Sequence, residues 1–537
     1  MNANSKLLRV TSKFIINKIN EADNLYKEKK YKEAIKLYEK TLKEISDKYA
    51  FDKFSIHNKI SNCYKHLDNI EKQIEHLEKT TQYCSVNPQI WFDLANLCNE
   101  LYPDKHCEYL SKAFELKPDM NYLRNLAFAT IINPKYKQKD IKNKLEHYVD
   151  LVRPIVLKDK KPYTHSKRDK NKKLKIAYMS SDFHSHAMMC FVLPLLENHN
   201  TKDFDITLYC CNKKQDEVTQ RIKNTGANFK DCSELNYEEL AEEIYNDEID
   251  ILIDLGGYTH DKIYTLLFKP APIQIQYLGF VGTYGIKEVD YIFADEFTIP
   301  KEVAPFYTEK PLYIESGLNR HTFTHHNTEL PEIPELPCLT NGYITFGCFN
   351  GFYKISNATI KLWAKVLKAV ENSKLLIYRF PMVEKAKKRI IREFQAEGID
   401  LDRIIFDDVR PEGSHFYCYA KCDIALDTIP YNGLTISIET MLMGVPVLTL
   451  NTYDTFASKG AGRINKIIKL NSFVTDSEED FINKALLLAN NIEILKLQRK
   501  TLRTFIQNSP LCCEHLSYAQ EIESLYTKIW KEYCDKD

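Results

Sequence analysis

The stretch CDIALDTIPYNGLTISIETMLMGVPVLTL, residues 422–450, decides the fold. CDIALDT is an apolar run that predicts a buried strand, and it ends in a Pro-Tyr-Asn-Gly turn. TISIETML then spaces its apolar residues as a helix does, and it closes at Gly444, a residue type common at helix C-caps. PVLTL predicts the next strand. Strand, helix and strand in this order indicate a βαβ unit and therefore a parallel sheet.

The turn in this unit carries groups that suit a phosphate. A glycine turn with Thr435 and Ser437 at a helix start offers backbone N–H groups, hydroxyls and the positive end of the helix dipole. Glu439, about one turn further on, is placed to accept hydrogen bonds from a ribose. An ordinary capped helix explains the same residues without a ligand, and both interpretations stay open on these grounds.

The same alternation of short apolar strands and helical stretches occurs twice. It predicts an α/β fold of two Rossmann-like domains, at residues 174–330 and 338–537, with the ligand in the cleft between them. A proline-rich linker at about residues 325–340 separates the two, and the final helix, SYAQEIESLYTKIWKEYC, is expected to cross back. The expected strands are LKIAYM, FDITLYCC, IDILIDL, IQIQYLG and VDYIFA in the first half, and YITFGCF, SKLLIYRF, RIIFDDV, CDIALDT and PVLTL in the second.

Residues 1–158 repeat a helical pattern. NLYKEKKYKEAIKLYEKTL is followed by related segments in NIEKQIEHLEKT and HCEYLSKAFELKP. Two helices per unit and a period near 34 residues are typical of tetratricopeptide repeats. Such units stack into an all-α solenoid whose concave side suits a peptide. Residues 159–173, DKKPYTHSKRDKNKK, are basic and almost free of apolar side chains, which predicts a linker rather than a nucleic-acid patch.

The composition excludes several partners. Lys+Arg and Asp+Glu are both 74, so no overall charge favours nucleic acid or an anionic membrane. The N-terminal sequence has no signal pattern and no apolar run is long enough to span a bilayer, so a cytoplasmic protein is expected. The 15 cysteines are scattered among apolar neighbours, as reduced thiols are, and no cluster has zinc-ligand spacing. We therefore expect no metal.

Two further polar segments follow predicted strands. SSDFHSHAMM, residues 180–189, comes directly after LKIAYM and brings two histidines and an aspartate to a strand exit, where open α/β sheets bind ligands. In YITFGCFNGFYKIS, Tyr353 and Lys354 emerge after a buried strand. A lysine there can neutralise the charge that develops on a leaving diphosphate. A solvated loop lysine is the alternative.

From about residue 172 onward the chain resembles the O-GlcNAc transferase and Spindly O-fucosyltransferase family, as a bacterial member. The resemblance rests on IAYMSSDFHSHA, DLGGYT, KPAPIQIQYLGFVGTYGIKEVDYIFAD, ITFGCFNGFYKIS and the 422–450 stretch, which occur in the family's order. It implies a GT-B arrangement of the two halves behind tetratricopeptide repeats. It also implies transfer of a sugar from a nucleotide sugar to a Ser or Thr of a polypeptide, with inversion and without a metal or other cofactor.

The resemblance also implies roles for individual residues. By motif position His186 lines the active site, and Lys354 meets the distal phosphate. Thr435 contacts a phosphate, Glu439 the ribose and His415 the nucleobase. The other expected site residues are Tyr353, Asn432 and Gly433 on the donor side, and Asp182, His184 and Thr283 on the acceptor side.

Some positions depart from the family pattern. Glu412 stands where O-GlcNAc transferases have a basic residue, and Ile436 stands where a second hydroxyl residue is common. GANFKDCSE lacks a histidine that the O-GlcNAc subgroup has there. These changes leave the donor open between UDP-GlcNAc, which we favour, another UDP-sugar and GDP-fucose.

Several alternatives remain at this point. In the favoured mechanism the repeats hold the acceptor polypeptide, Lys354 stabilises the departing diphosphate, and His186 acts as a base or positions groups. A rival is a non-catalytic repeat scaffold with a degenerate transferase domain, and a third reading gives the enzyme a glycan or small-molecule acceptor. Repeats also mediate homo-oligomers, which the sequence does not decide.

Overall fold

The computed structural model describes residues 13–99, 101–166, 169–322, 330–412 and 414–535. The chain divides into two compact units, Met1–Ala129 and Thr130–Asp537. Parts of the predicted regions lie outside the described residues: residues 1–12 and 100 of the repeat region, 167–168 of the linker, 323–329 around the connection between the two halves, and 413 and 536–537 of the second half.

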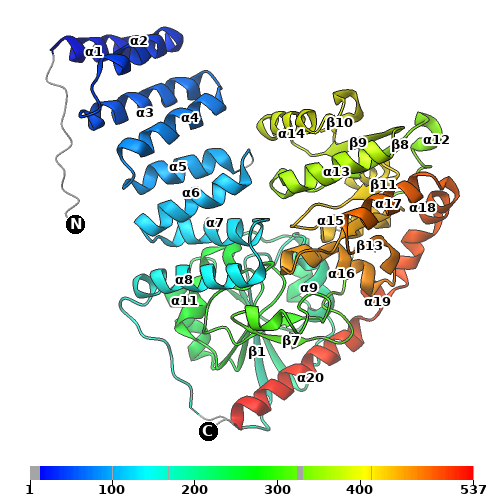
Figure 1. The fold of residues 1–537 in the computed structure, drawn as a ribbon. Coiled ribbons are helices and arrows are strands. Elements are labelled where there is room, and N and C mark those ends of the chain that lie inside the picture. The colour runs from blue at the N-terminus through cyan, green and yellow to red at the C-terminus, as the bar shows by residue number, and fades with distance from the viewer. Residues whose placement is uncertain (1–12, 100, 167–168, 323–329, 413, 536–537) are drawn as a thin grey trace. The chain divides into compact units, whose positions relative to one another are not determined.

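The first unit is built from helices, as predicted. Neighbouring helices pack in pairs, α1 on α2, α3 on α4 and α5 on α6, and each pair packs on the next (Figure 1). This confirms the repeated helical pattern of the sequence. The bounds are α1 (Lys13–Lys27), α2 (Tyr31–Glu44), α3 (Ala50–His66), α4 (Ile70–Tyr83), α5 (Pro88–Cys98), α6 (Pro103–Leu116) and α7 (Met120–Ile131).

The apolar stripe of each helix fills the space between the pairs. Ala34, Ile35 and Tyr38 of α2 are buried against Ile56 and Ile60 of α3 in one cluster. These residues recur three and four positions apart, so they lie on one face of each helix. A single pair leaves this face open, and stacking covers it.

The next helix, α8 (Gln138–Val156), belongs to the second unit. Its Gln138 side chain donates to the carbonyl oxygen of Phe306 (3.2 Å). The following residues, 159–166 and 169–173, form no helix or strand. They lie against the first half of the second unit, because the Tyr163 N–H donates to the carbonyl oxygen of Phe268 (2.7 Å).

The first half of the second unit is a parallel sheet in the order β3-β2-β1-β4-β5-β6-β7. The chain starts in the middle at β1 and builds outward in both directions, so the order reverses between β1 and β4. The strands are β1 (Leu174–Ser180), β2 (Phe204–Cys210), β3 (Asn228–Asp231), β4 (Ile251–Asp254), β5 (Ile273–Gln276), β6 (Tyr291–Ala294) and β7 (Lys310–Tyr313), and the helices are α9 (Met189–Leu196), α10 (Glu217–Lys223) and α11 (Tyr237–Asn246).

The second half repeats this design in the order β10-β9-β8-β11-β12-β13, again all parallel, with its reversal between β8 and β11. The strands are β8 (Ile344–Cys348), β9 (Ser373–Tyr378), β10 (Ile404–Asp407), β11 (Ile424–Leu426), β12 (Val447–Leu450) and β13 (Val474–Thr475). The helices are α12 (Cys338–Asn341), α13 (Asn357–Ala369), α14 (Glu384–Ala396), α15 (Thr435–Leu442), α16 (Gly460–Ile467), α17 (Glu478–Ala489), α18 (Ile492–Gln507), α19 (Pro510–Cys513) and α20 (His515–Cys534).

All ten strands expected from the sequence are present, and three more were missed. The missed strands, β3, β7 and β13, are all at a sheet edge. An edge strand is covered on fewer sides than a central one, and β3 buries none of its four residues. Its sequence NFKD therefore has no apolar run to detect. The expected two-domain α/β architecture is confirmed.

The last helix, α20, runs from the second half onto the first (Figure 1). The Tyr526 hydroxyl lies 2.9 Å from the Tyr178 hydroxyl of β1, and the Tyr518 hydroxyl donates to the carbonyl oxygen of Leu318 (2.7 Å). One hydrophobic core therefore continues from the first sheet through α20 into the second half. Within the described part of the chain, no helix combines the length and apolar character that a bilayer crossing requires.

Candidate functional site

The reversal of strand order in each sheet marks where ligands bind in such folds. In the second half, the loops that leave β8 and β11 flank this point, and they carry Lys354 and the Asn432–Gly433 turn. In the first half, the loop that leaves β1 carries His186. The three segments that the sequence singled out thus each stand at a topological switch point.

Lys354 lies in the short helix η5 (Phe352–Lys354) and reaches the turn after β11. Its Nζ donates to the carbonyl oxygen of Asn432 (2.9 Å) and sits 3.7 Å from the centroid of the Tyr431 ring. Burial lowers the pKa of Lys354 to about 8, an effect that the nearby Asp427 carboxylate opposes. An ammonium that has lost part of its hydration gains more from an incoming anion than an exposed one does.

Asp427, which the sequence reading did not select, holds this turn together. Its buried carboxylate accepts hydrogen bonds from the Gly433 N–H (2.8 Å) and the Thr449 hydroxyl (2.9 Å). Burial raises the pKa of Asp427 to about 6, against the effect of these hydrogen bonds. The available signal was its position, since it directly follows β11 and precedes the glycine turn.

The turn itself is tightly packed. The Asn432 side chain donates to the carbonyl oxygen of Thr428 (2.7 Å), and its own N–H donates to the carbonyl oxygen of Ala457 (3.0 Å). A Cβ on Gly433 would come within 2.6 Å of the Ser437 Oγ, so a larger residue would force the serine side chain to move. Asn432 and Gly433 therefore shape the backbone here.

Helix α15 begins directly after this turn, at Thr435. No side chain caps its N-terminus, so the capping alternative does not account for the residues there. Uncapped N–H groups and the helix dipole favour an anion. At its other end Gly444 has φ +72°, as expected for a glycine that closes a helix.

The side chains of His415 and Glu439 lie near each other. The Tyr419 hydroxyl donates to the Glu439 carboxylate, and the His415 Nε2 is 3.9 Å from the Glu439 Oε1. The His415 side chain is 45% exposed, and its ring centroid lies 4.4 Å from that of Phe416. Tyr353 is half-buried beside Tyr431, with ring centroids 6.2 Å apart.

The segment after β1 gathers Asp182, His184 and His186. The His186 Nδ1 is 3.5 Å from the Asp182 Oδ2, and the rings of His184 and His186 have centroids 5.8 Å apart. The Ser180 hydroxyl accepts from the Asp182 N–H (2.9 Å), which fixes the start of the loop. The His186 side chain is 44% exposed, so a substrate hydroxyl can approach it.

Thr283, expected on the acceptor side, is fully buried. Its hydroxyl donates to Glu309 (2.6 Å), which also accepts from the Tyr284 N–H (2.7 Å). Burial raises the pKa of Glu309 to about 7. The Tyr284 hydroxyl in turn donates to Asp254 at the end of β4 (2.5 Å). This network ties the loop after β5 to the end of β4, the second strand at the switch point.

Residues of α9 in the first half and of α15 in the second, among them Cys190 and Ile438, belong to one hydrophobic core. Burial raises the pKa of the Cys190 thiol in α9, and the negative charge of Glu439 in α15 raises it further. Cys190 stands four residues after His186, so this shared core begins next to the histidine segment. Within the described ranges, no three or more His, Cys, Asp or Glu side chains are grouped as a metal site would need.

Comparison with known proteins identifies relatives over the same region. The profile of glycosyl transferase family 41 matches residues 133–331 and 335–522, more than half of the chain. A tomato (Solanum lycopersicum) protein described as probable UDP-N-acetylglucosamine–peptide N-acetylglucosaminyltransferase SPINDLY is 28% identical over 374 residues. These residues are 68% of this chain and 39% of the tomato protein.

Two further relatives extend the comparison. The Arabidopsis thaliana protein with the corresponding description, SEC, is 31% identical over 389 residues, 70% of this chain and 39% of the relative. The chain thus spans about two fifths of the length of these relatives. A mutant O-GlcNAc transferase from Thermobaculum terrenum shares the fold, with a TM-score of 0.74 at 22% identity over 97% of this chain and 98% of that one.

Proposed function

Because this chain belongs to glycosyl transferase family 41, we propose that it transfers a sugar from a nucleotide sugar to a Ser or Thr hydroxyl of a polypeptide. One observation carries the proposal. Lys354, the Gly433 turn and the uncapped N-terminus of α15 converge at the switch point of the second sheet. Together they provide positive charge and N–H donors for a diphosphate.

The chemistry follows from that placement. The acceptor hydroxyl oxygen forms a bond to the anomeric carbon while the bond from that carbon to the diphosphate oxygen breaks. The electron pair leaves with the diphosphate, and Lys354 with the α15 N-terminus stabilises the negative charge that develops there. Attack opposite the leaving group inverts the anomeric centre. No metal is needed for this step in the proposal, because these groups supply the positive charge.

His186 is the titratable group proposed for the acceptor side. Its side chain is exposed, and its Nδ1 accepts from the Met188 N–H (3.3 Å) and lies 3.5 Å from Asp182, which favours an imidazole held in one orientation. The hydroxyl proton passes to His186 if the histidine is the base; otherwise His186 positions the acceptor. A pH profile of transfer by the wild type and His186→Gln separates the two roles.

The donor proposed first is UDP-GlcNAc, in line with the printed descriptions of the SPINDLY and SEC relatives. His415 is proposed to stack on the nucleobase and Glu439 to bind the ribose, since the two side chains lie near each other. GDP-fucose remains the second donor candidate, because Glu412 replaces a basic residue near His415. The proposed acceptor is a polypeptide held by the helical repeats, and all 15 cysteines are free, which suits a reducing cytoplasm.

Calorimetric titration with UDP, UDP-GlcNAc and GDP-fucose, without added metal, tests the proposal. We expect one nucleotide class to bind and the affinity to fall roughly tenfold or more in Lys354→Ala, because a charged hydrogen bond contributes about 1.5–3 kcal/mol. The matched control is Lys361→Ala, an exposed lysine on α13. Binding of none of the three would favour the non-catalytic scaffold instead.

A further inference from the structure

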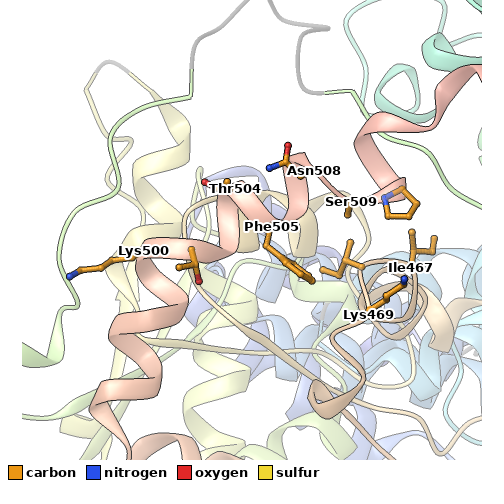
Figure 2. Close-up of a pocket in the computed structure, with 10 residues that line it drawn as sticks. Ile467, Lys469, Lys500, Thr504, Phe505, Asn508 and Ser509 are labelled. Carbon is orange, nitrogen blue, oxygen red and sulfur yellow. The ribbon is translucent and has the colours of Figure 1, made fainter.

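A groove separate from the proposed donor site lies between α16 and α18. Its volume is about 640 Å³, within the range of ligand and peptide sites. Figure 2 shows its walls: Ile467 and Lys469 come from the end of α16, and Lys500, Thr504, Phe505 and Asn508 come from α18 and its exit. We call these six residues the α18 groove.

Its floor presents an apolar surface to solvent. Phe505 is 46% exposed, and its ring extends from α18 toward Ile467 (Figure 2). The opposite face of α18 provides the core contacts, since Leu502 and Ile506 are buried. Phe505 therefore adds little to the core, and covering its ring would remove apolar surface from water.

The rim is positively charged and open to a partner. Lys469 and Lys500 are exposed, and neither forms an ion pair or side-chain hydrogen bond with the described residues. Thr504 and Asn508 likewise have side-chain hydrogen-bonding groups without a described partner. No acidic residue lines the groove. Its charge therefore complements carboxylates.

A second cavity lies on the other flank of α18. A neighbouring cavity of about 670 Å³ shares Lys500 and is lined by Lys496 and Arg503 on one side. On its other side runs the irregular segment Glu332–Leu336, with the sequence EIPEL. An acidic, apolar and proline-containing segment of this chain thus lines one cavity together with the basic side chains of α18.

Both walls of the groove also contact the donor segment. A Cβ on Gly460, the first residue of α16, would be 2.6 Å from the carbonyl oxygen of Gly433. On α18, Arg503 Nε donates to the carbonyl oxygen of Leu442 (2.7 Å) and Arg499 to that of Met443 (3.1 Å), at the end of α15. A ligand that shifts α16 would therefore also shift the Gly433 turn, and one that shifts α18 would also shift α15.

We propose that the α18 groove is a regulatory docking site for an acidic, apolar peptide segment of a partner protein, similar in chemistry to EIPEL. Carboxylates pair with Lys469 and Lys500, and an aliphatic side chain covers Phe505. The docked segment alters nucleotide affinity through the ends of α15 and α16. Docking itself is independent of the proposed function, and only its effect on the nucleotide rests on it.

Fluorescence anisotropy with a labelled PEIPELP peptide, the sequence of residues 331–337, tests the docking. We expect saturable binding that weakens at least tenfold in the double variant Lys469→Glu/Lys500→Glu and in Phe505→Ala. Lys528→Glu, an exposed lysine of α20, is the charge control and should bind as the wild type. The neutral peptide PQIPQLP should bind at least tenfold more weakly.

Three results would overturn the docking proposal: no saturation up to about 1 mM peptide, equal binding of the neutral peptide, or equal binding by the double variant. Capture by phosphatidylserine vesicles without peptide binding would also overturn it. For the regulatory part, nucleotide affinity is first measured without peptide, which tests the donor site alone. A peptide effect of at least threefold on that affinity is expected, and an unchanged affinity with bound peptide refutes regulation.

Discussion

Raising the pH is expected to weaken nucleotide-sugar binding through Lys354. Burial lowers the pKa of this lysine to about 8 in the unliganded protein. A bound diphosphate favours the charged ammonium and raises its pKa again. Well below pH 8 the lysine is already charged, so nucleotide affinity has its highest value there. Above pH 8 binding must take up a proton, so affinity falls as the pH rises.

The size of the effect follows from that pKa. About nine tenths of the Lys354 side chains carry charge at pH 7 and about one tenth at pH 9. The apparent dissociation constant should therefore rise roughly tenfold between these values, about 1.4 kcal/mol. At pH 8 binding should take up about half a proton. Calorimetry in two buffers of different ionisation enthalpy measures that uptake.

A second buried lysine makes a control necessary. Burial also lowers the pKa of Lys459, beside the donor turn, to about 8. Lys354→Arg separates the two, because a guanidinium stays charged across this range. The variant should lose the pH dependence. A wild type whose affinity is the same at pH 7 and pH 9, or a variant that keeps the tenfold loss, would refute the role given to Lys354.

Three further predictions concern other parts of the chain. His57 and His76 are buried in the repeats with Nδ1 atoms 3.1 Å apart, and burial lowers both pKa values to about 4. The pKa of an unfolded histidine is about 6.5, so the free energy of unfolding should fall between pH 6.5 and pH 4. The loss should be about 2 kcal/mol per histidine at pH 5. Melting followed by circular dichroism measures this loss, and His76→Leu should make it smaller. Gly279→Ala would place a Cβ 1.7 Å from the carbonyl oxygen of Leu255. It should lower the free energy of unfolding, measured in urea, by about 3 kcal/mol. An unchanged urea midpoint would contradict this packing. Asp427→Asn should keep or raise the melting temperature, because burial of the carboxylate raises its pKa to about 6. The same variant should bind the nucleotide about tenfold more weakly. Nucleotide affinity equal to that of the wild type would contradict the role of Asp427 in positioning the turn.

The sequence predicted the sheets well because their central strands are buried on both faces. Such strands read as continuous apolar runs, as IDILIDL does. The edge strands β3, β7 and β13 lack this signal. Chain order also predicted which loops lie at the switch points, since the carboxyl ends of parallel strands meet at one edge. Lys354 and Gly433 could be selected in this way.

The supporting residues could not be selected, because their partners are distant in sequence. Thr449 reaches Asp427 from the next strand, 22 residues away, and Glu309 reaches Thr283 across 26 residues. Only the folded sheet brings these groups together. The sequence around Asp427 and Thr283 therefore gives no sign that Asp427 holds the donor turn or that Thr283 is buried. The spacing of apolar residues along the chain shows which residues share a face of a helix or strand, but it does not show contacts between distant segments.

Sugar transfer itself tests the central claim most directly. Purified protein is incubated with UDP-GlcNAc or GDP-fucose and a Ser/Thr peptide library, and mass spectrometry detects sugar on the peptides. We expect transfer from one donor, its loss in Lys354→Ala, and wild-type transfer by Lys361→Ala. Transfer that persists unchanged in a folded Lys354→Ala protein, or no transfer from either donor by a protein that binds the nucleotide, would contradict the account.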